Sequence, residues 1–123
     1  MKLNLDSSTA KYVINAYDTG MITVNNQVYM QNMIVTSNQI IDHWEPGHVE
    51  QINENHIHHL IGLKPEIILL GTGKNLTFPH PKLISIAMQQ GIGFEVMDTG
   101  SACRTYNILS AEDRNIAAAL IML

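Results

Sequence analysis

Two short glycine-containing stretches hold the residues whose types and spacing could support chemistry. GTGKN covers residues 71–75, and GFEVMDTGSACRTYN covers residues 93–107. The second stretch places Asp98, the only cysteine, Cys103, and Arg104 just after an apolar run. A carboxylate, a thiol and a guanidinium at such a point suit a ligand site. They suit equally well the turn by which a strand becomes a helix.

The first stretch could hold an anion. Backbone N–H groups of Gly71, Thr72 and Gly73 could cradle a phosphate or carboxylate after a strand. A dinucleotide fingerprint requires a third glycine where this chain has Leu76, and a P-loop requires more residues between its glycines. A turn that uses glycine's backbone freedom is therefore the preferred interpretation, with a nucleotide site, aided by Asp98 as a ribose-binding acid, as the alternative.

Cys103 lies near an expected helix N-terminus beside Arg104, two features that favour the thiolate of a nucleophile. None of the six histidines falls in a recognisable partner motif, so a packed, unreactive cysteine is preferred. For Asp98 and Arg104 we expect an internal ion pair that fixes the turn, although the arginine could instead bind a ligand's carboxylate or phosphate. The sequence thus predicts no catalytic, cofactor-binding or metal-binding residue. It predicts one candidate pocket, formed by Gly71, Thr72, Gly73, Asp98, Cys103 and Arg104.

A histidine-rich stretch invites a metal interpretation. On a helix, His56 and His59 share a face, whereas His58 points elsewhere, and no cysteine or carboxylate motif completes a tetrahedral set. We therefore expect no metal and a solvated helix face. Trp44 is expected to be a core anchor, with a partner contact as the alternative.

The elements that must position these residues begin with β-structure. Asn25-Asn26 separates two alternating runs, which predicts a hairpin, after a turn at Gly20. Further strands are expected over residues 32–36 and 39–44. A short amphipathic helix should follow an N-cap at Asn53 and end near Gly62.

From residue 66 onward the pattern alternates. Residues 66–70 read as a buried strand, and a helix should start near Pro81 and stop at Gly91. FEVM reads as a second strand, and a helix capped by Thr99 or Ser101 follows. The ending RNIAAALIML is compatible with helix or strand. A right-handed crossover would bring GTG and DTGSACR together at the carboxyl ends of adjacent parallel strands.

The totals limit the function. A chain of 123 residues with 46% hydrophobic and 15% charged residues is most simply one globular domain, residues 1–123. Its formal charge of −4 argues against nucleic acid as a partner, and one cysteine cannot form an internal disulfide. No apolar run reaches the length of a membrane span, and the start MKLNLDSSTA has no signal or transit pattern, so a cytoplasmic location is expected.

PEIILLGTGKNLTFPHP, GFEVMDTGSACRTYNIL and AEDRNIAAALI together resemble the family of small Mth-type domains that includes mitochondrial complex I assembly factor 3 and the adipogenesis-associated Mth domain-containing protein. The resemblance, which extends to IVTSNQIIDHW, implies an α/β fold of three layers. It has a central mixed, mostly parallel sheet with helices on its faces, an antiparallel N-terminal hairpin region and a C-terminal strand. The chain departs from the mitochondrial relative in lacking a transit pattern, and from many relatives in having Asp113 where they carry glycine.

The resemblance also implies a role. It favours a non-enzymatic protein, similar to a complex I assembly factor, that acts by binding protein partners and needs no cofactor. The alternative is a small-molecule or nucleotide-binding protein, possibly an enzyme, that uses the GTG and DTGSACR turns.

Overall fold

The computed structural model describes residues 11–122. The strands are β1 Ile14–Asp18, β2 Met21–Val24, β3 Gln27–Tyr29, β4 Met33–Thr36, β5 Ile40–Ile41, β6 Ile67–Gly71, β7 Gly93–Met97 and β8 Ile116–Leu120. The helices are the 3-10 turn η2 Val49–Gln51 and the α-helices α1 Glu54–Gly62, α2 Pro81–Gln89 and α3 Thr99–Ala111. This order confirms the alternation of strand and helix predicted from residue 66 onward, and the ambiguous C-terminal stretch is a strand.

The first three strands form an antiparallel sheet in the order β1-β2-β3. Gly20 joins β1 to β2 with a φ of 82°, and Asn25 and Asn26 join β2 to β3 with φ values of 48° and 68°. Glycine and asparagine tolerate this left-handed backbone region better than other residues, which is why they occupy tight hairpin turns. The predicted hairpin at Asn25-Asn26 is confirmed.

The second sheet has five strands in the order β5-β4-β8-β6-β7. β6 pairs in parallel with both β7 and β8, whereas β4 pairs in antiparallel fashion with β5 and β8. The sheet is therefore mixed, as expected, with its parallel part formed by β8, β6 and β7. The strand expected over residues 39–44 is shorter, because the chain leaves the sheet after β5 and Trp44 turns into the core.

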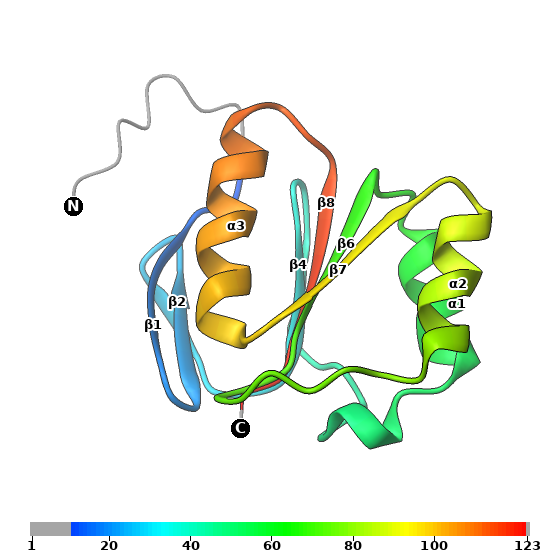
Figure 1. Ribbon diagram of the computed structural model, residues 1–123. Coiled ribbons are helices and arrows are strands. Elements are labelled where there is room, and N and C mark those ends of the chain that lie inside the picture. Colours follow the sequence, from blue (N-terminus) through cyan, green and yellow to red (C-terminus); the bar gives the residue numbers. More distant parts are fainter. Residues whose placement is uncertain (1–10, 123) are drawn as a thin grey trace.

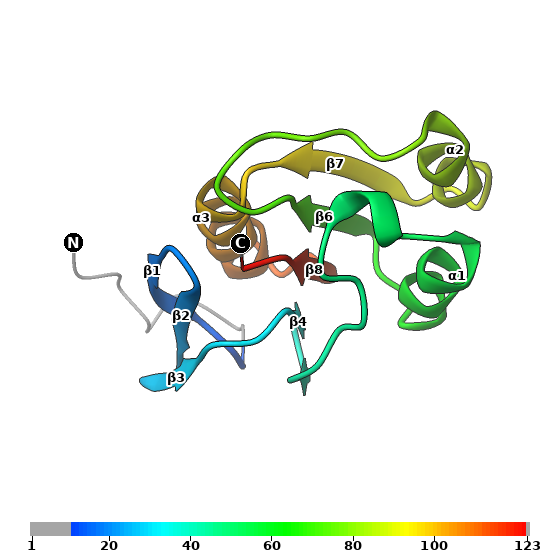
Figure 2. The same ribbon diagram turned by 90° about the horizontal axis from the view of Figure 1, so that it is seen from below.

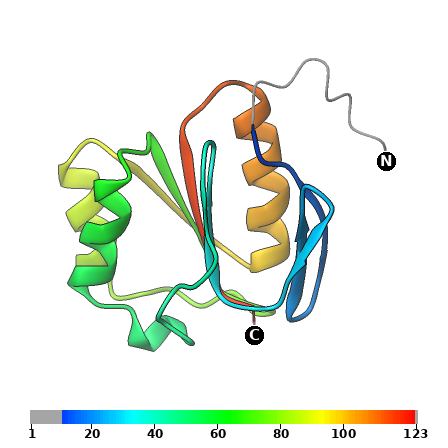
Figure 3. The same cartoon turned by 180° about the vertical axis from the view of Figure 1, so that it is seen from behind.

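The elements are stacked in three layers. α3 and the β1-β2-β3 sheet cover one face of the five-stranded sheet, and α1 and α2 cover the other (Figures 1 and 2). The view from behind shows β4 beside the hairpin sheet, with α1 and α2 on the far side of the strands (Figure 3). The carboxyl ends of β6, β7 and β8 lie at the same rim, close to the C-terminus (Figure 1). The predicted three-layer α/β fold is confirmed.

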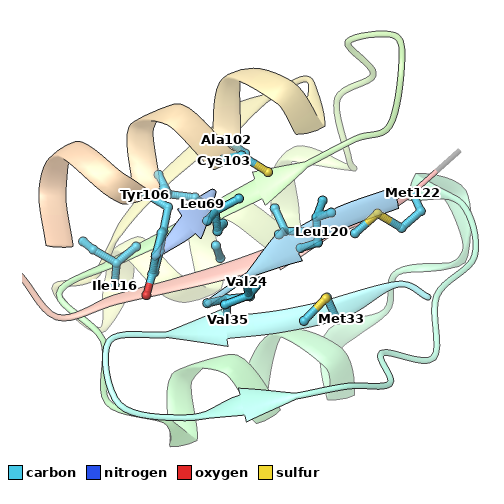
Figure 4. Close-up of a cluster of buried hydrophobic side chains, with 13 residues drawn as sticks. Val24, Met33, Val35, Leu69, Ala102, Cys103, Tyr106, Ile116, Leu120 and Met122 are labelled. Atoms are coloured by element: carbon cyan, nitrogen blue, oxygen red, sulfur yellow. The ribbon is translucent and has the colours of Figure 1, made fainter. Parts of the chain in front are cut away.

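Alternating side chains of the five-stranded sheet fill two separate cores. Leu69 and Leu120 face α3 and the hairpin sheet, together with Cys103 and Tyr106 of α3 (Figure 4). Ile68 and its neighbours face α1 and α2. A strand covered on both faces must be apolar at every position, which explains the continuous runs of β6 and β8.

The helix ends follow the sequence signals. Asn53 caps α1 by accepting a hydrogen bond from the His56 N–H at 3.1 Å, and Pro81 is in the first turn of α2. Gly91, with a φ of 77°, ends the α2 segment. Both helix starts and the glycine stop were predicted from the sequence.

Candidate functional site

The GTG and DTGSACR turns lie side by side at the carboxyl ends of β6 and β7. The Thr72 N–H donates to the carbonyl of Met97 at 2.9 Å, and the Thr99 N–H donates to the carbonyl of Gly73 at 2.9 Å. The Gly73 N–H in turn donates to Thr99 Oγ1 at 2.8 Å. The predicted juxtaposition is confirmed, and these three N–H groups are used to join the two turns rather than to cradle an anion.

Thr99 is the residue that ties this rim together. Its side chain is fully buried, and its hydroxyl accepts from Gly73 and donates to the carbonyl of Ile121 beyond β8. The turns after β6 and β8 and the start of α3 therefore meet at one oxygen atom. The sequence pattern predicts Thr99 only as a helix cap. The sequence signal that could have indicated this role is the position of Thr99, a small hydroxyl residue that directly follows strand β7 and Asp98.

Position 71 requires glycine because Thr99 packs closely against its backbone. A Cβ at this position would lie 2.9 Å from Thr99 Oγ1, a distance that real Cβ atoms essentially never show, and 3.0 Å from the backbone Cα of Thr99, which is tighter than most real Cβ contacts. Its carbonyl also accepts the Ile121 N–H at 2.9 Å. Gly73 differs, since its φ of 98° requires the left-handed conformation that glycine adopts without cost. The local structure therefore explains why both positions are occupied by glycine.

The acid of the motif is the helix cap. Asp98 accepts from the Ser101 N–H at 2.8 Å and from the Ser101 hydroxyl at 2.9 Å, and the hydrogen bond from the N–H is the main cause of its lowered pKa. The expected caps, Thr99 and Ser101, are wrong. Asp98 takes that position because a carboxylate accepts the free N–H groups of a first turn and complements the helix dipole.

Arg104 does not form the expected ion pair. Its Nη2 atom donates to the Ser101 hydroxyl at 3.1 Å, and that hydroxyl binds Asp98, so a serine stands between the two charges. The ion pairs found among residues 11–122 do not include Asp98 with Arg104. The side chain of Arg104 is exposed and leaves most of its donors toward solvent.

Cys103 is packed between α3 and the sheet. It is 3% exposed, and burial raises the pKa of its thiol to about 12, against which the nearby Arg104 acts only in part. A thiol with such a pKa is almost entirely protonated at neutral pH and is a poor nucleophile. The preferred sequence interpretation, a buried cysteine, is confirmed.

A groove of about 410 Å³ runs between β1 and α3. Arg104 and Cys103 are part of its wall, whereas Gly71, Thr72, Gly73 and Asp98 are not. The structure therefore separates the six residues of the candidate pocket into an internal junction and an open groove. The full lining is Ile14, Asn15, Ala16, Tyr17, Gly100, Cys103, Arg104, Asn107 and Ile108.

Long-range hydrogen bonds hold β1 against α3. The side chain of Asn107 accepts from the Ile14 N–H at 2.9 Å and donates to the Ile14 carbonyl at 2.6 Å, as a neighbouring strand would. Gly100 permits the close approach of Tyr17, because a Cβ there would lie 3.3 Å from the tyrosine ring. No local sequence pattern predicts this wall, since β1 and the part of α3 that binds it lie some 90 residues apart in the chain.

One histidine of the HIHH stretch, His56, makes structural contacts. His56 accepts from the Asn53 N–H through Nδ1 at 2.9 Å and contacts Glu45 through Nε2 at 2.7 Å. Trp44, 3% exposed, packs against the His56 ring at 6.2 Å, in agreement with the core role expected for it. Among residues 11–122, no group of three or more histidine, cysteine or carboxylate side chains is placed to hold a metal ion.

The sequence and the fold are similar to those of known proteins. The 13 kDa major membrane protein of Francisella tularensis subsp. holarctica is 27% identical over 122 residues, which are 98% of this chain and 99% of that protein. NADH dehydrogenase (ubiquinone) 1 alpha subcomplex assembly factor 3 of Mus musculus is 32% identical over 114 residues. The match covers 91% of this chain but 60% of that protein, so this chain spans less than two thirds of the assembly factor's length.

Solved structures of other proteins have a fold similar to that of this chain. The crystal structure of a protein from Bordetella parapertussis has a TM-score of 0.86 at 32% identity and covers 94% of this chain and 98% of that one. The solution structure of a Bordetella pertussis protein, described as a Mth938-like domain, has a TM-score of 0.81 at 28% identity and covers 99% of this chain and 92% of that one.

One family model covers almost all of the described chain. It matches residues 14–121 and is described as a protein of unknown function, DUF498/DUF598. Together with the Mth938-like structure and the assembly factor 3 relatives, it confirms the resemblance stated from the sequence. The chain therefore belongs to the DUF498/DUF598 family of Mth-type α/β proteins.

Proposed function

We propose that the protein is a non-enzymatic binding protein, with a role related to that of the complex I assembly factors, and that the groove between β1 and α3 is its protein-binding surface. The observation that carries the proposal is the composition of this groove. Its walls are strand backbone, apolar side chains such as Ile108, which is 60% exposed, and one exposed cation, Arg104. An apolar surface with a single arginine anchor is typical of protein recognition.

The chemistry of the site supports binding over catalysis. The one thiol at the groove, that of Cys103, has a pKa raised to about 12 by burial. Asp98 is occupied as a helix cap, and its lowered pKa makes it a weak general base at neutral pH. The nucleotide-binding alternative is not favoured, because the N–H groups of Thr72, Gly73 and Thr99 bind within the protein.

Other parts of the proposal concern the chain as a whole. We take residues 1–123 to act as one domain without metal or cofactor, and the charge of −4 disfavours nucleic acid as a partner. No helix within residues 11–122 is long and apolar enough to cross a membrane. A cytoplasmic location is proposed, although one relative is named a membrane protein.

Affinity capture with a matched pair of variants tests the groove. Tagged wild-type protein, Ile108→Asp and Met88→Asp are each used to capture proteins from a lysate of the native organism, with mass spectrometry as the readout. Ile108 lies in the groove and Met88 on α2, and the two side chains are almost equally exposed, at 60% and 61%. The pair therefore separates the position of the new charge from its general effect on the surface.

The proposal expects subunits of respiratory NADH dehydrogenase to be captured by wild type and by Met88→Asp, and to be lost with Ile108→Asp. Thermal unfolding of each variant shows that it remains folded. If both variants capture the subunits equally well, the groove is not the binding surface. The absence of any stable protein partner, with a small molecule retained instead, would favour the alternative function.

A further inference from the structure

Both helices of the layer formed by α1 and α2 begin at a hydrogen bond to a histidine ring. His56 Nδ1 accepts the Asn53 N–H at 2.9 Å, and His80 Nδ1 accepts the Lys82 N–H at 3.1 Å. The two helices lie side by side on the face of the five-stranded sheet away from α3 (Figures 1 and 2). α3 begins instead at a carboxylate, that of Asp98.

These hydrogen bonds fix the protonation of both rings. A backbone N–H group can only donate, so an Nδ1 atom that accepts from it carries no proton. His56 therefore has its single ring proton on Nε2, which donates to the Glu45 carboxylate at 2.7 Å. Histidine is the side chain that gains a further proton between about pH 5 and 8. In mild acid this proton would be added to the atom that forms each cap, and the hydrogen bond would be lost.

The charges around His56 do not compensate for this loss. Glu45 faces Nε2 from the preceding loop, but its side chain is 79% exposed, so its attraction for an added charge is small. Glu54, in the first turn of α1, lies 3.7 Å from Lys82 of α2, and the partial positive charge of a helix N-terminus opposes a further cation. The cap of α1 is therefore complete while His56 is neutral and is lost as the pH falls.

His80 is in a similar position at the start of α2. It lines a hollow of about 490 Å³ together with Glu50 of η2, and Lys82 lies two residues further along the chain. With one acid and one base near the ring, the hydrogen bond from the Lys82 N–H is the main difference between the neutral and the protonated form. The contact between Glu54 and Lys82 joins the two helix starts, so both caps respond at the same end of the layer.

We propose that the start of the α1–α2 layer is a proton-sensitive switch, closed when His56 and His80 are neutral and opened when both are protonated. Opening releases the loop that carries Trp44, which is buried and packs on the His56 ring at 6.2 Å. The α3 side keeps its shape in the same pH range, because hydrogen bonds from Ser101 lower the pKa of Asp98 and keep this cap ionised. The inference goes beyond the proposed function, since it concerns the face opposite the groove.

Hydrogen–deuterium exchange of the full-length chain at about pH 7.5 and about pH 5.5 tests the switch. The matched variant is His56→Gln/His80→Asn, because glutamine at the third helical position and asparagine at the N-cap keep a side-chain acceptor that does not titrate. At the higher pH, wild type and the variant should exchange alike. At the lower pH, residues 53–60 and 80–86 should exchange about fivefold faster in wild type than in the variant, as expected for the loss of a cap, whereas residues 99–111 should not differ.

Trp44 gives a second readout, because it is the only tryptophan of the chain. Its fluorescence should change between the two pH values in wild type and stay constant in the double variant. His58→Gln/His59→Gln is the control, since both side chains are exposed on the same helix and their removal should leave the wild-type response intact.

Three results would overturn the proposal. Wild type shows no faster exchange than the double variant at the lower pH, the fluorescence of the double variant responds to pH as that of wild type does, or residues 99–111 respond as strongly as the starts of α1 and α2. If instead the control variant loses the response, the cause is the general surface charge and the proposal is also wrong.

Discussion

The rim junction around Thr99 and the groove between β1 and α3 share one helix but differ in how they use polar groups. At the junction, the hydroxyl of Thr99 and the N–H of Gly73 find partners inside the protein, and Thr99 is fully buried. At the groove, Arg104 makes one hydrogen bond and stays exposed. The residues that look most like a ligand motif are therefore those that assemble the fold, and the surface open to a partner lies one helix face away.

The physical reason is the position of the motif. Three chain segments end at the same rim, and each leaves backbone groups that need partners once they are buried. A threonine hydroxyl can accept and donate at once, which suits it to join them. The groove, by contrast, lies at the outer edge of β1, where water satisfies polar groups and side chains remain available. Four substitutions test this contrast, from the largest expected effect to the smallest.

Thr99→Val should have the largest effect on stability. Valine keeps the shape of threonine but removes the hydroxyl, so the Gly73 N–H and the Ile121 carbonyl lose their buried partner. Because each unsatisfied buried group costs about 1–3 kcal/mol, we expect a loss of roughly 2–5 kcal/mol in the free energy of unfolding, measured in urea. Thr105→Val, on a half-exposed position of the same helix, is the control. A loss no larger than that of the control would show that the junction is not critical.

Gly71→Ala should be the next most damaging change. The new methyl group would lie 2.9 Å from Thr99 Oγ1 and 3.0 Å from Thr99 Cα, so two packed segments must separate. Overpacking of this kind costs about 1–3 kcal/mol. Gly62→Ala is the matched control, since nothing lies within 4 Å of a Cβ there and the residue is helical, so this change should be neutral or stabilise by up to about 1 kcal/mol. Equal unfolding midpoints for the two variants would contradict the close-approach explanation of Gly71.

Much of the rim could be predicted from local signals, and most of the groove could not. The apolar run bounded by Pro65 and Gly71, together with the rule that crossovers are right-handed, predicted that the GTG and DTGSACR turns lie side by side. The parallel pairing of β6 and β7 confirms this. The partner predicted for Arg104 was wrong, because Ser101 lies three residues before it on the same helix face and binds both the arginine and Asp98. The wall formed by Ile14 depends on Asn107, 93 residues away, for which the sequence contains no local pattern.

Asp98→Ala should have an intermediate effect that depends on pH. Loss of a helix cap costs about 1 kcal/mol at neutral pH, because the Ser101 N–H then has no side-chain acceptor. The pKa of Asp98 is lowered in the folded protein from its usual 3.8, so its contribution to stability is present above that value and is lost as the pH falls through the folded-state pKa. Urea unfolding should therefore show a clear difference between wild type and variant at about pH 7 and a smaller one at about pH 3. A difference that does not change with pH would mean that the charge of the cap contributes nothing.

Arg104→Ala should have the smallest effect on the free protein. The ion pair expected from the sequence would have made this substitution lower the melting temperature clearly, but the observed side chain is exposed and bonds only to the Ser101 hydroxyl at 3.1 Å. Surface changes of this kind alter stability by less than about 0.5 kcal/mol. Its effect should appear instead in the capture experiment, where removal of the groove's exposed cation weakens partner binding. If the variant loses more than about 1 kcal/mol in the free energy of unfolding measured in urea, Arg104 stabilises the fold as the junction residues do. Unchanged stability with weakened capture would place it with the groove, because a group whose donors face solvent in the free protein contributes its interaction energy only when a partner arrives.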